Sequence, residues 1–212
     1  MLTTAKAHID PEDDLAGYAL LYNDGGADYY DVVKLDLETN EAHELRVENP
    51  VHSMQLSASQ EFAVGVLRPE DSWGSGLDQY ADSRWGLAVV NLRSGEEEVV
   101  SLVVESQPVG VELIEDADAG ATYALVLMAG VESLLKLDLA QPSDYVEFEL
   151  AAPPVGIGSI PGETDFYVTH DSPLGLISFL DPSTDEITTS HGFAVVELIE
   201  DDTLPRRDSE ED

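Results

Sequence analysis

The chain has 212 residues, of which 43% are hydrophobic, with 44 Asp and Glu against nine Lys and Arg and no cysteine. The formal charge of −35 disfavours nucleic acids and anionic membranes as partners, and the lack of cysteine excludes disulfides and thiolate chemistry. Because no apolar run approaches a membrane span or the core of a signal peptide, we expect no membrane insertion and no export signal here, and the compartment stays open.

The acidic charge has three interpretations. It can be a solvated surface that keeps the protein soluble, for example in a salty habitat where ions screen the self-repulsion. It can bind divalent cations through clustered carboxylates. It can also dock to a basic partner. The solvated surface is the interpretation we favour.

Short segments recur along the chain in four units. The first unit, about residues 5–49, contains AKAHI, YALLY, VVKLDL and HELRV in that order. The second unit, 50–107, contains PVHSMQLS, FAVGVL, LAVVNL and EEVVSLVV. The third unit, 108–153, contains PVGVELI, YALVLM, LLKLDL and YVEFEL, and the fourth, 154–199, contains PVGIGSI, FYVTH, LISFLDP and EITTS. Each unit therefore repeats the same four phrases.

These phrases predict β-strands, because they are short, rich in β-branched and aromatic residues, and bounded by turn residues. No sustained helical pattern of apolar residues is present. Four strands repeated about every 44 residues are typical of a β-propeller blade, with an apolar inner strand and a charged outer edge. A β-sandwich does not explain why a Pro-Val phrase precedes an aromatic strand by 12 to 15 residues three times. We therefore predict an all-β propeller of about four blades, each with four antiparallel strands.

The number of inner strands leaves the closure of the ring open. FAVVELI at 193–199 resembles a fifth inner strand, and residues 201–212 read as an acidic disordered tail. Either the chain is a true four-bladed ring closed by one terminal phrase, or it is an incomplete ring or one of a pair of half-rings. We favour the incomplete ring, whose open apolar faces predict a homodimer.

The segment from SQPVGVELI to PPVGIGSI resembles the bacterial seven-bladed propellers of the lactonase and surface-layer repeat class. DSRWGLAVVNLRSGEEEVVSL and ISFLDPSTDEITTSHGFAV further resemble uncharacterised propeller lipoproteins and secreted proteins of myxobacteria and their relatives. The resemblance covers residues 5–200 and implies the propeller fold and an exported location. The Pro-Asp-Gly turn of that class is replaced by EDADAGAT and PGET. No lactonase ligand set can be mapped onto this chain residue by residue.

The longest insertion in the repeat, residues 68–84, is the best candidate for ligand binding, because long loops on a rigid scaffold tend to carry function. Its acidic and aromatic side chains suit a sugar, a cationic ligand or a peptide. The alternative is a surface flap whose Trp73 folds back on its own blade. We expect this loop to lie at the mouth of the propeller channel, and His52, on an inner strand, to approach the same mouth. The predicted ligand-binding residues are Asp71, Trp73, Asp78, Tyr80, Asp82, Arg84 and His52.

The same mouth is a candidate metal site. Oxygen-rich side chains there, together with one histidine, suit Ca²⁺ or Mg²⁺, although no EF-hand run is present and Asp-Gly turns are common for backbone reasons alone. The candidate ligands are Asp24, Asp28, Asp171 and His170, joined by Asp71 and Asp82 from the long loop. No nucleophile elbow and no phosphate-binding loop occurs.

The sequence therefore favours a non-enzymatic propeller module that binds a protein, peptide or glycan. One alternative is a divalent-metal-dependent, lactonase-like hydrolase. The other is a structural fragment of a larger exported propeller.

Overall fold

The computed structural model describes residues 2–7, 18–23, 30–47, 49–69, 84–93, 98–116, 120–160 and 165–192. These residues form sixteen strands and no helix, so the all-β prediction is confirmed. Accordingly, none of them belongs to a helix long and apolar enough to cross a membrane. The predicted fifth inner strand and the predicted tail lie outside the described residues, so both stay predictions.

The strands form four separate antiparallel sheets, each paired in chain order. The first sheet contains β1 (Leu2–Ala7), β2 (Tyr18–Asn23), β3 (Tyr30–Asp36) and β4 (Ala42–Val47). The second contains β5 (Val51–Leu56), β6 (Phe62–Leu67), β7 (Trp85–Asn91) and β8 (Glu98–Val104). The third contains β9 (Pro108–Asp116), β10 (Ala121–Met128), β11 (Ser133–Asp138) and β12 (Tyr145–Glu149). The fourth contains β13 (Pro154–Ser159), β14 (Phe166–His170), β15 (Ile177–Asp181) and β16 (Glu186–Ser190).

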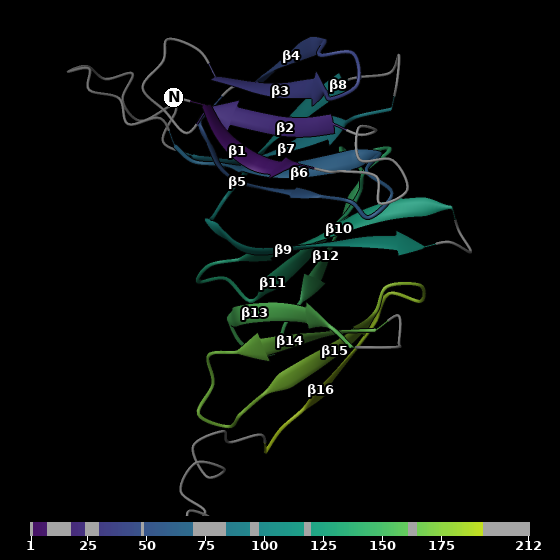
Figure 1. The fold of residues 1–212 in the computed structure, drawn as a ribbon. Coiled ribbons are helices and arrows are strands. Elements are labelled where there is room, and N and C mark those ends of the chain that lie inside the picture. Colours follow the sequence, from purple (N-terminus) through teal and green to yellow (C-terminus); the bar gives the residue numbers. More distant parts are fainter. Residues whose placement is uncertain are drawn as a thin grey trace, which may run out of the picture.

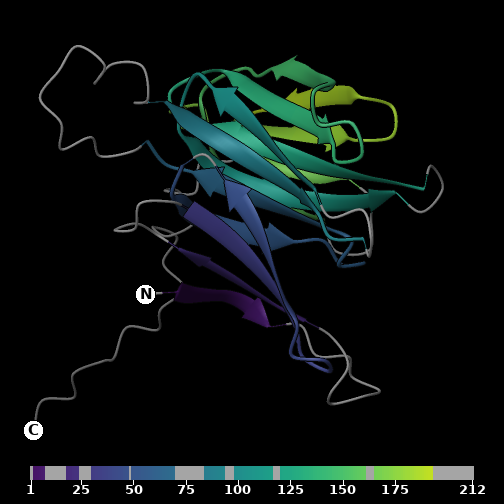
Figure 2. The same ribbon diagram turned by 90° about the horizontal axis from the view of Figure 1, so that it is seen from above.

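The four sheets follow one another as propeller blades. The inner strands β1, β5, β9 and β13 contact each other in that order, and the sheets run from the first at the top of Figure 1 to the fourth at the bottom. The turned view in Figure 2 shows the same succession, from the purple first sheet to the yellow-green fourth sheet. The four sheets do not close into a ring, as the sequence favoured. Dimerisation of such an open arc stays a prediction.

The core consists of apolar layers between successive blades. Leu20 and Val32 of the first blade pack against Val51 and Ala88 of the second, and equivalent layers join the second blade to the third and the third to the fourth. All six residues of β6 are buried, because the second blade has a neighbour on both faces. This layering explains why the second phrases of the second and third units, FAVGVL and YALVLM, are nearly continuous apolar runs.

The Asp or Asn that ends each third strand has a local structural role. The carboxylate of Asp36 accepts the backbone N–H of Glu38 at 2.9 Å, and that of Asp181 accepts the N–H of Ser183 at 2.9 Å. Asn91 and Asp138 accept a backbone N–H two residues on in the same way. These Asx turns form the connections to the outer strands. The repeated apolar-Asp-apolar tag is therefore scaffold.

Two of the repeated phrases are shifted by one residue in the structure. The aromatic position of the second strand is shared by Tyr18, Phe62 and Tyr123, but in the fourth blade Asp165 takes that place. Phe166 lies one residue further on and packs toward the preceding blade. The Pro-Val phrase also differs, because Pro50 precedes β5 whereas Pro108 is the first residue of β9. The similarity of the phrases in the sequence aligns Phe166 with the aromatic residues and Pro108 with Pro50, and the structure shifts each by one residue.

The two lysines of the repeated KLDL phrase clamp blades together. The Nζ of Lys34 donates to the carbonyl of Leu92 in the second blade at 2.8 Å. The Nζ of Lys136 donates to the carbonyl of Pro182 and to Asp185 in the fourth blade, both at 2.5 Å, and lies 4.5 Å from the ring centroid of Tyr123. At the junction between the second and third blades the equivalent residue is Val89, which is buried. Lys34 therefore links the first blade to the second, and Lys136 links the third blade to the fourth.

Replacing Lys136, the buried lysine that links the third blade to the fourth, should weaken the fold. Lys136→Met leaves the carbonyl of Pro182 without its cationic donor, so we expect the free energy of unfolding to fall by about 1–3 kcal/mol, measured by urea denaturation. Asp185→Asn should cost less, because the bond from Lys136 to the carbonyl remains. A Lys136→Met protein as stable as the original would contradict the clamp.

The Asx turns should make stability depend on pH. The Ser183 hydroxyl and N–H hold the pKa of Asp181 at about 2, below its ordinary 3.8. A lowered folded-state pKa stabilises the fold above the unfolded value, and this contribution is lost as pH falls through about 2. Asp181→Asn keeps the acceptor oxygen without titrating. The stability difference between the two proteins in thermal melts should therefore shrink from pH 3.8 to about 2; a constant difference would contradict the assignment.

Candidate functional site

At one end of the blades, the connections between second and third strands meet the linkers that enter the inner strands. The N–H of Arg68 donates to the carbonyl of Pro50 at 2.9 Å. The same bond recurs in the third blade from Ala129 to Gln107 at 2.7 Å, and in the fourth from Asp171 to Pro153 at 2.9 Å. These bonds fix the base of each connection. The long connection at 68–84 therefore starts from a rigid position.

His52 stands beside the exit of this long connection. It is the unpaired residue of a bulge in β5, and its exposed ring makes an edge-to-face contact with Trp85 at 5.9 Å between centroids. Trp85 opens β7 directly after Arg84, which is also exposed. The structure thus places His52 against Trp85, the residue that follows Arg84 in the chain, and the sequence reasoning missed Trp85. Its signal was an aromatic residue placed immediately after the loop.

The remaining predicted ligand-binding residues lie outside the described part of the chain: Asp71, Trp73, Asp78, Tyr80 and Asp82. Asp24 and Asp28 of the predicted metal site also lie outside it. Their roles stay predictions.

The inner strands present one exposed side chain at each bulge on this side. Val109 of β9 is 46% exposed and Val155 of β13 is 59% exposed, and both occupy the bulge position that His52 occupies in β5. Bulges commonly re-aim a side chain in this way. The described inner-strand surface at this end is therefore largely apolar, with one imidazole beside the long connection.

His170 is held within the protein. It is buried, its Nδ1 donates to the carbonyl of Ala152 at 2.7 Å, and its Nε2 lies 2.8 Å from the hydroxyl of Ser178. Ser178 in turn contacts Thr189 Oγ1 at 2.8 Å. Both ring nitrogens are thus used to join β14, β15 and the preceding linker. Asp171, its neighbour, is exposed.

The described residues alone contain no group of three or more His, Asp or Glu side chains arranged to hold a metal ion. Asp171 and His170 are adjacent in the chain, but His170 turns into the core. The predicted Ca²⁺ site would need ligands from outside the described ranges, so it stays a prediction.

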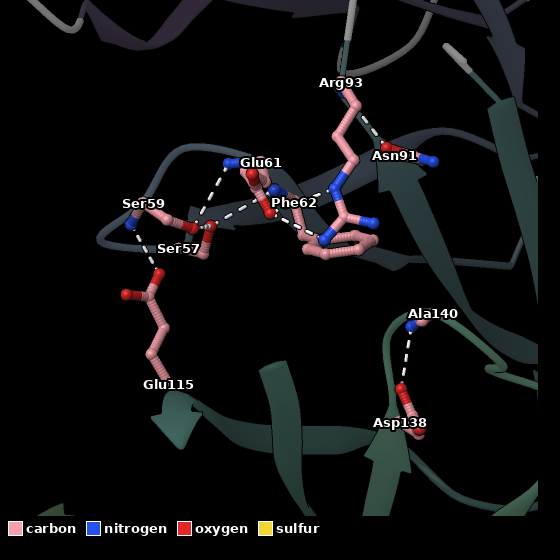
Figure 3. A network of polar contacts seen from close by, with 9 residues as sticks. All are labelled: Ser57, Ser59, Glu61, Phe62, Asn91, Arg93, Glu115, Asp138 and Ala140. Carbon is pink, nitrogen blue, oxygen red and sulfur yellow. Dashed lines mark hydrogen bonds and ion pairs between the residues drawn. The ribbon is translucent and has the colours of Figure 1, made fainter. Parts of the chain in front are cut away.

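The opposite end of the blades carries a polar network at the junction of the second and third blades (Figure 3). The guanidinium of Arg93 contacts Glu61 through Nε at 3.0 Å and Nη2 at 2.7 Å, and lies 4.8 Å from the ring centroid of Phe62. The carboxylate of Glu115 in β9 accepts the N–H of Ser59 from the second blade. Because the Arg93–Glu61 pair is exposed, its stabilising contribution is small. The network orients turns and holds no candidate reactive group.

Successive antiparallel four-stranded sheets joined through their inner strands define a β-propeller protein. No protein-family model and no curated protein sequence matches the chain. Among solved structures, the chain is similar to dihydro-heme d1 dehydrogenase NirN, with a TM-score of 0.57 and 14% identity over 90% of this chain and 38% of that one. It is also similar to hydrazine synthase of Kuenenia stuttgartiensis, with a TM-score of 0.50 and 13% identity over 89% of this chain and 54% of that one. The chain thus spans less than two thirds of either structure, and the likeness shows the fold alone.

A substitution at His170 separates its structural role from metal binding. His170→Ala removes two hydrogen bonds and leaves a cavity, so we expect the free energy of unfolding to fall by about 2–4 kcal/mol, measured by urea denaturation. Asp171→Ala, at an exposed position, should change it by less than about 0.5 kcal/mol. Added Ca²⁺ should change neither result; a Ca²⁺-dependent stabilisation that both variants lose would contradict the structural role.

Proposed function

We propose that this β-propeller chain is a non-enzymatic binding module whose ligand, a protein, peptide or glycan, contacts the 68–84 connection together with His52. The observation that carries the proposal is the exposed His52 packed edge-on against Trp85 at the exit of that connection. An exposed imidazole and an indole at a fixed position are suited to contact the ring of a sugar or a planar or cationic group of a peptide.

The uniformity of the other connections supports this assignment. The equivalent connections of the third and fourth blades, 129–132 and 171–176, are short. The insertion in the second blade is therefore an addition to a scaffold that does not need it. Long connections on a rigid scaffold commonly carry binding, and the backbone bond from Arg68 to Pro50 supplies the rigid base.

The charge of the chain favours a ligand that is cationic or neutral. A formal charge of −35 attracts basic groups and raises their rate of encounter. The Asp, Trp and Tyr side chains of the connection fit this selection. The activities of the dehydrogenase and the hydrazine synthase are properties of those proteins and enter no part of the proposal.

The proposal predicts that the connection is needed for binding and not for folding. Replacing residues 71–82 by a short Gly-Ser linker should leave the thermal melt within a few degrees, because loop length costs little. The variant should lose the signals that the unaltered protein gives on arrays of glycans and basic peptides. His52→Ala should weaken them, while Val155→Ala, at an exposed position in another blade, should not.

A folded deletion variant that keeps every signal would refute the assignment. A native protein that gives no signal on either array would refute it as well.

A further inference from the structure

The outer strand of the second blade differs from the outer strands of the other blades. β4 carries exposed Glu44 and Arg46, and β12 carries exposed Glu147 and Glu149. β16 carries Glu186 at its start and mostly polar residues, ITTS, after it. β8, by contrast, reads VVSLVV after Glu98, so it has no charge from Val99 to Val104 and is apolar at five of these six positions. Outer strands are normally protected by charged side chains, because their free backbone groups can pair with another chain. β8 ends its sheet and lacks this protection along its length.

Two cavities lie along the side of β8 that faces the third blade. The larger, about 240 Å³, is lined by Leu102 and Val104 of β8 and by Leu135 and Tyr145 across the junction. The smaller, about 200 Å³, is lined by Val100 near the start of β8, with other residues from both blades. Alternate residues of one strand thus border a cleft along the outer part of this junction.

The cleft exists where the lysine clamp is absent. At the other two described junctions Lys34 and Lys136 reach across to the carbonyls of Leu92 and Pro182. Here the equivalent side chain is Val89, which lines the smaller cavity together with Leu139 and is too short to cross. The outer strands β4 and β8 contact each other at the first junction, whereas the larger cavity separates β8 from β12.

The larger cavity is apolar with an acidic rim, whereas the smaller is also lined by Asn91, Glu98 and Arg93, whose guanidinium pairs with Glu61. Val103 is 58% exposed and Tyr145 is 54% exposed, and both line the larger cavity. Among the residues that the structure describes, the charged ones that line this cavity are Glu105 and Glu147, and both are exposed. Glu98 marks the other end of the strand. An occupant of this surface must therefore be apolar in its middle and basic at its ends.

We propose that the outer edge of β8 and the cleft beside it bind an extended segment of a partner protein, with alternating apolar side chains between Lys or Arg residues. The segment adds a strand to the sheet through backbone hydrogen bonds, and its apolar side chains enter the cleft. Its basic ends pair with Glu98 at one end, and with Glu105 and Glu147 at the other.

A second copy of this chain fits the edge less well than a basic segment. Antiparallel pairing of two β8 strands would place Glu98 of each copy close to Glu105 of the other, so like charges would meet at both ends. Like charges opposite each other destabilise a strand pair. The proposed occupant is therefore a different protein.

The test uses a fluorescein-labelled peptide, Lys-Val-Thr-Val-Thr-Val-Lys, and its counterpart with Glu at both ends, titrated against the full chain by fluorescence anisotropy. We expect the Lys peptide to bind, its affinity to fall as salt is added, and the Glu peptide to bind at least about tenfold more weakly. Val103→Lys places a protecting charge on the edge at an exposed site, and should weaken binding at least about tenfold.

Val155→Lys is the matched control, because Val155 is 59% exposed in the fourth blade, and it should bind as the original does. The double variant Glu105→Gln, Glu147→Gln should lose part of the preference for the Lys peptide. Binding unaffected by Val103→Lys, equal loss with Val155→Lys, or no binding by the unaltered protein would overturn the proposal. So would a dimer in sedimentation that Val103→Lys dissociates, since it would assign the edge to a second copy.

Discussion

The second and third sheets of this protein have two apolar faces each, and the need to cover both by neighbouring sheets is the constraint on which the structure depends. In the third blade, Leu125 and Leu127 face the fourth blade and are fully buried. In the fourth blade the equivalent residues are Tyr167, which is 38% exposed, and Thr169. The last described face is thus more polar than the internal ones, as expected for a sheet that has no described neighbour beyond it. The same requirement explains why the blades follow one another in chain order, because each blade covers one face of the blade before it.

Polar groups decide how the blades are fastened. Lys34 and Lys136 lie on otherwise apolar faces, and each reaches a backbone carbonyl of the next blade. A buried amino group must be hydrogen-bonded, so each lysine fixes the relative position of two sheets more specifically than apolar contact does. The middle junction relies on apolar packing and on an exposed polar network at one end. Its outer part is consequently left with cavities, and the neighbouring edge strand carries no charge after Glu98.

The regular repeat and the departures from it have different roles. The Asx turns and the backbone bonds at the bases of the connections recur from blade to blade because they shape the connections between strands. The 68–84 connection and β8, which is uncharged after Glu98, occur in the second blade, and neither is required by the packing of the sheets. Both proposed binding surfaces therefore belong to the same blade, one at its end and one along its outer edge.

Strand positions, sheet order and the Asp turns could be predicted from the sequence, because they depend on the local alternation of apolar and turn residues. The partners of the two lysines could not, since Leu92 and Pro182 are 58 and 46 residues away in the chain. Nor could the role of His170, whose place beside acidic residues at the predicted mouth suggested a metal ligand, whereas both of its ring nitrogens are hydrogen-bonded within the protein. Of the predicted site, the structure joined His52 to Trp85 through a contact across strands. The sequence by itself determined the strands and their repetition; only the tertiary structure decided which residues meet between blades, because those contacts depend on how one sheet packs against the next.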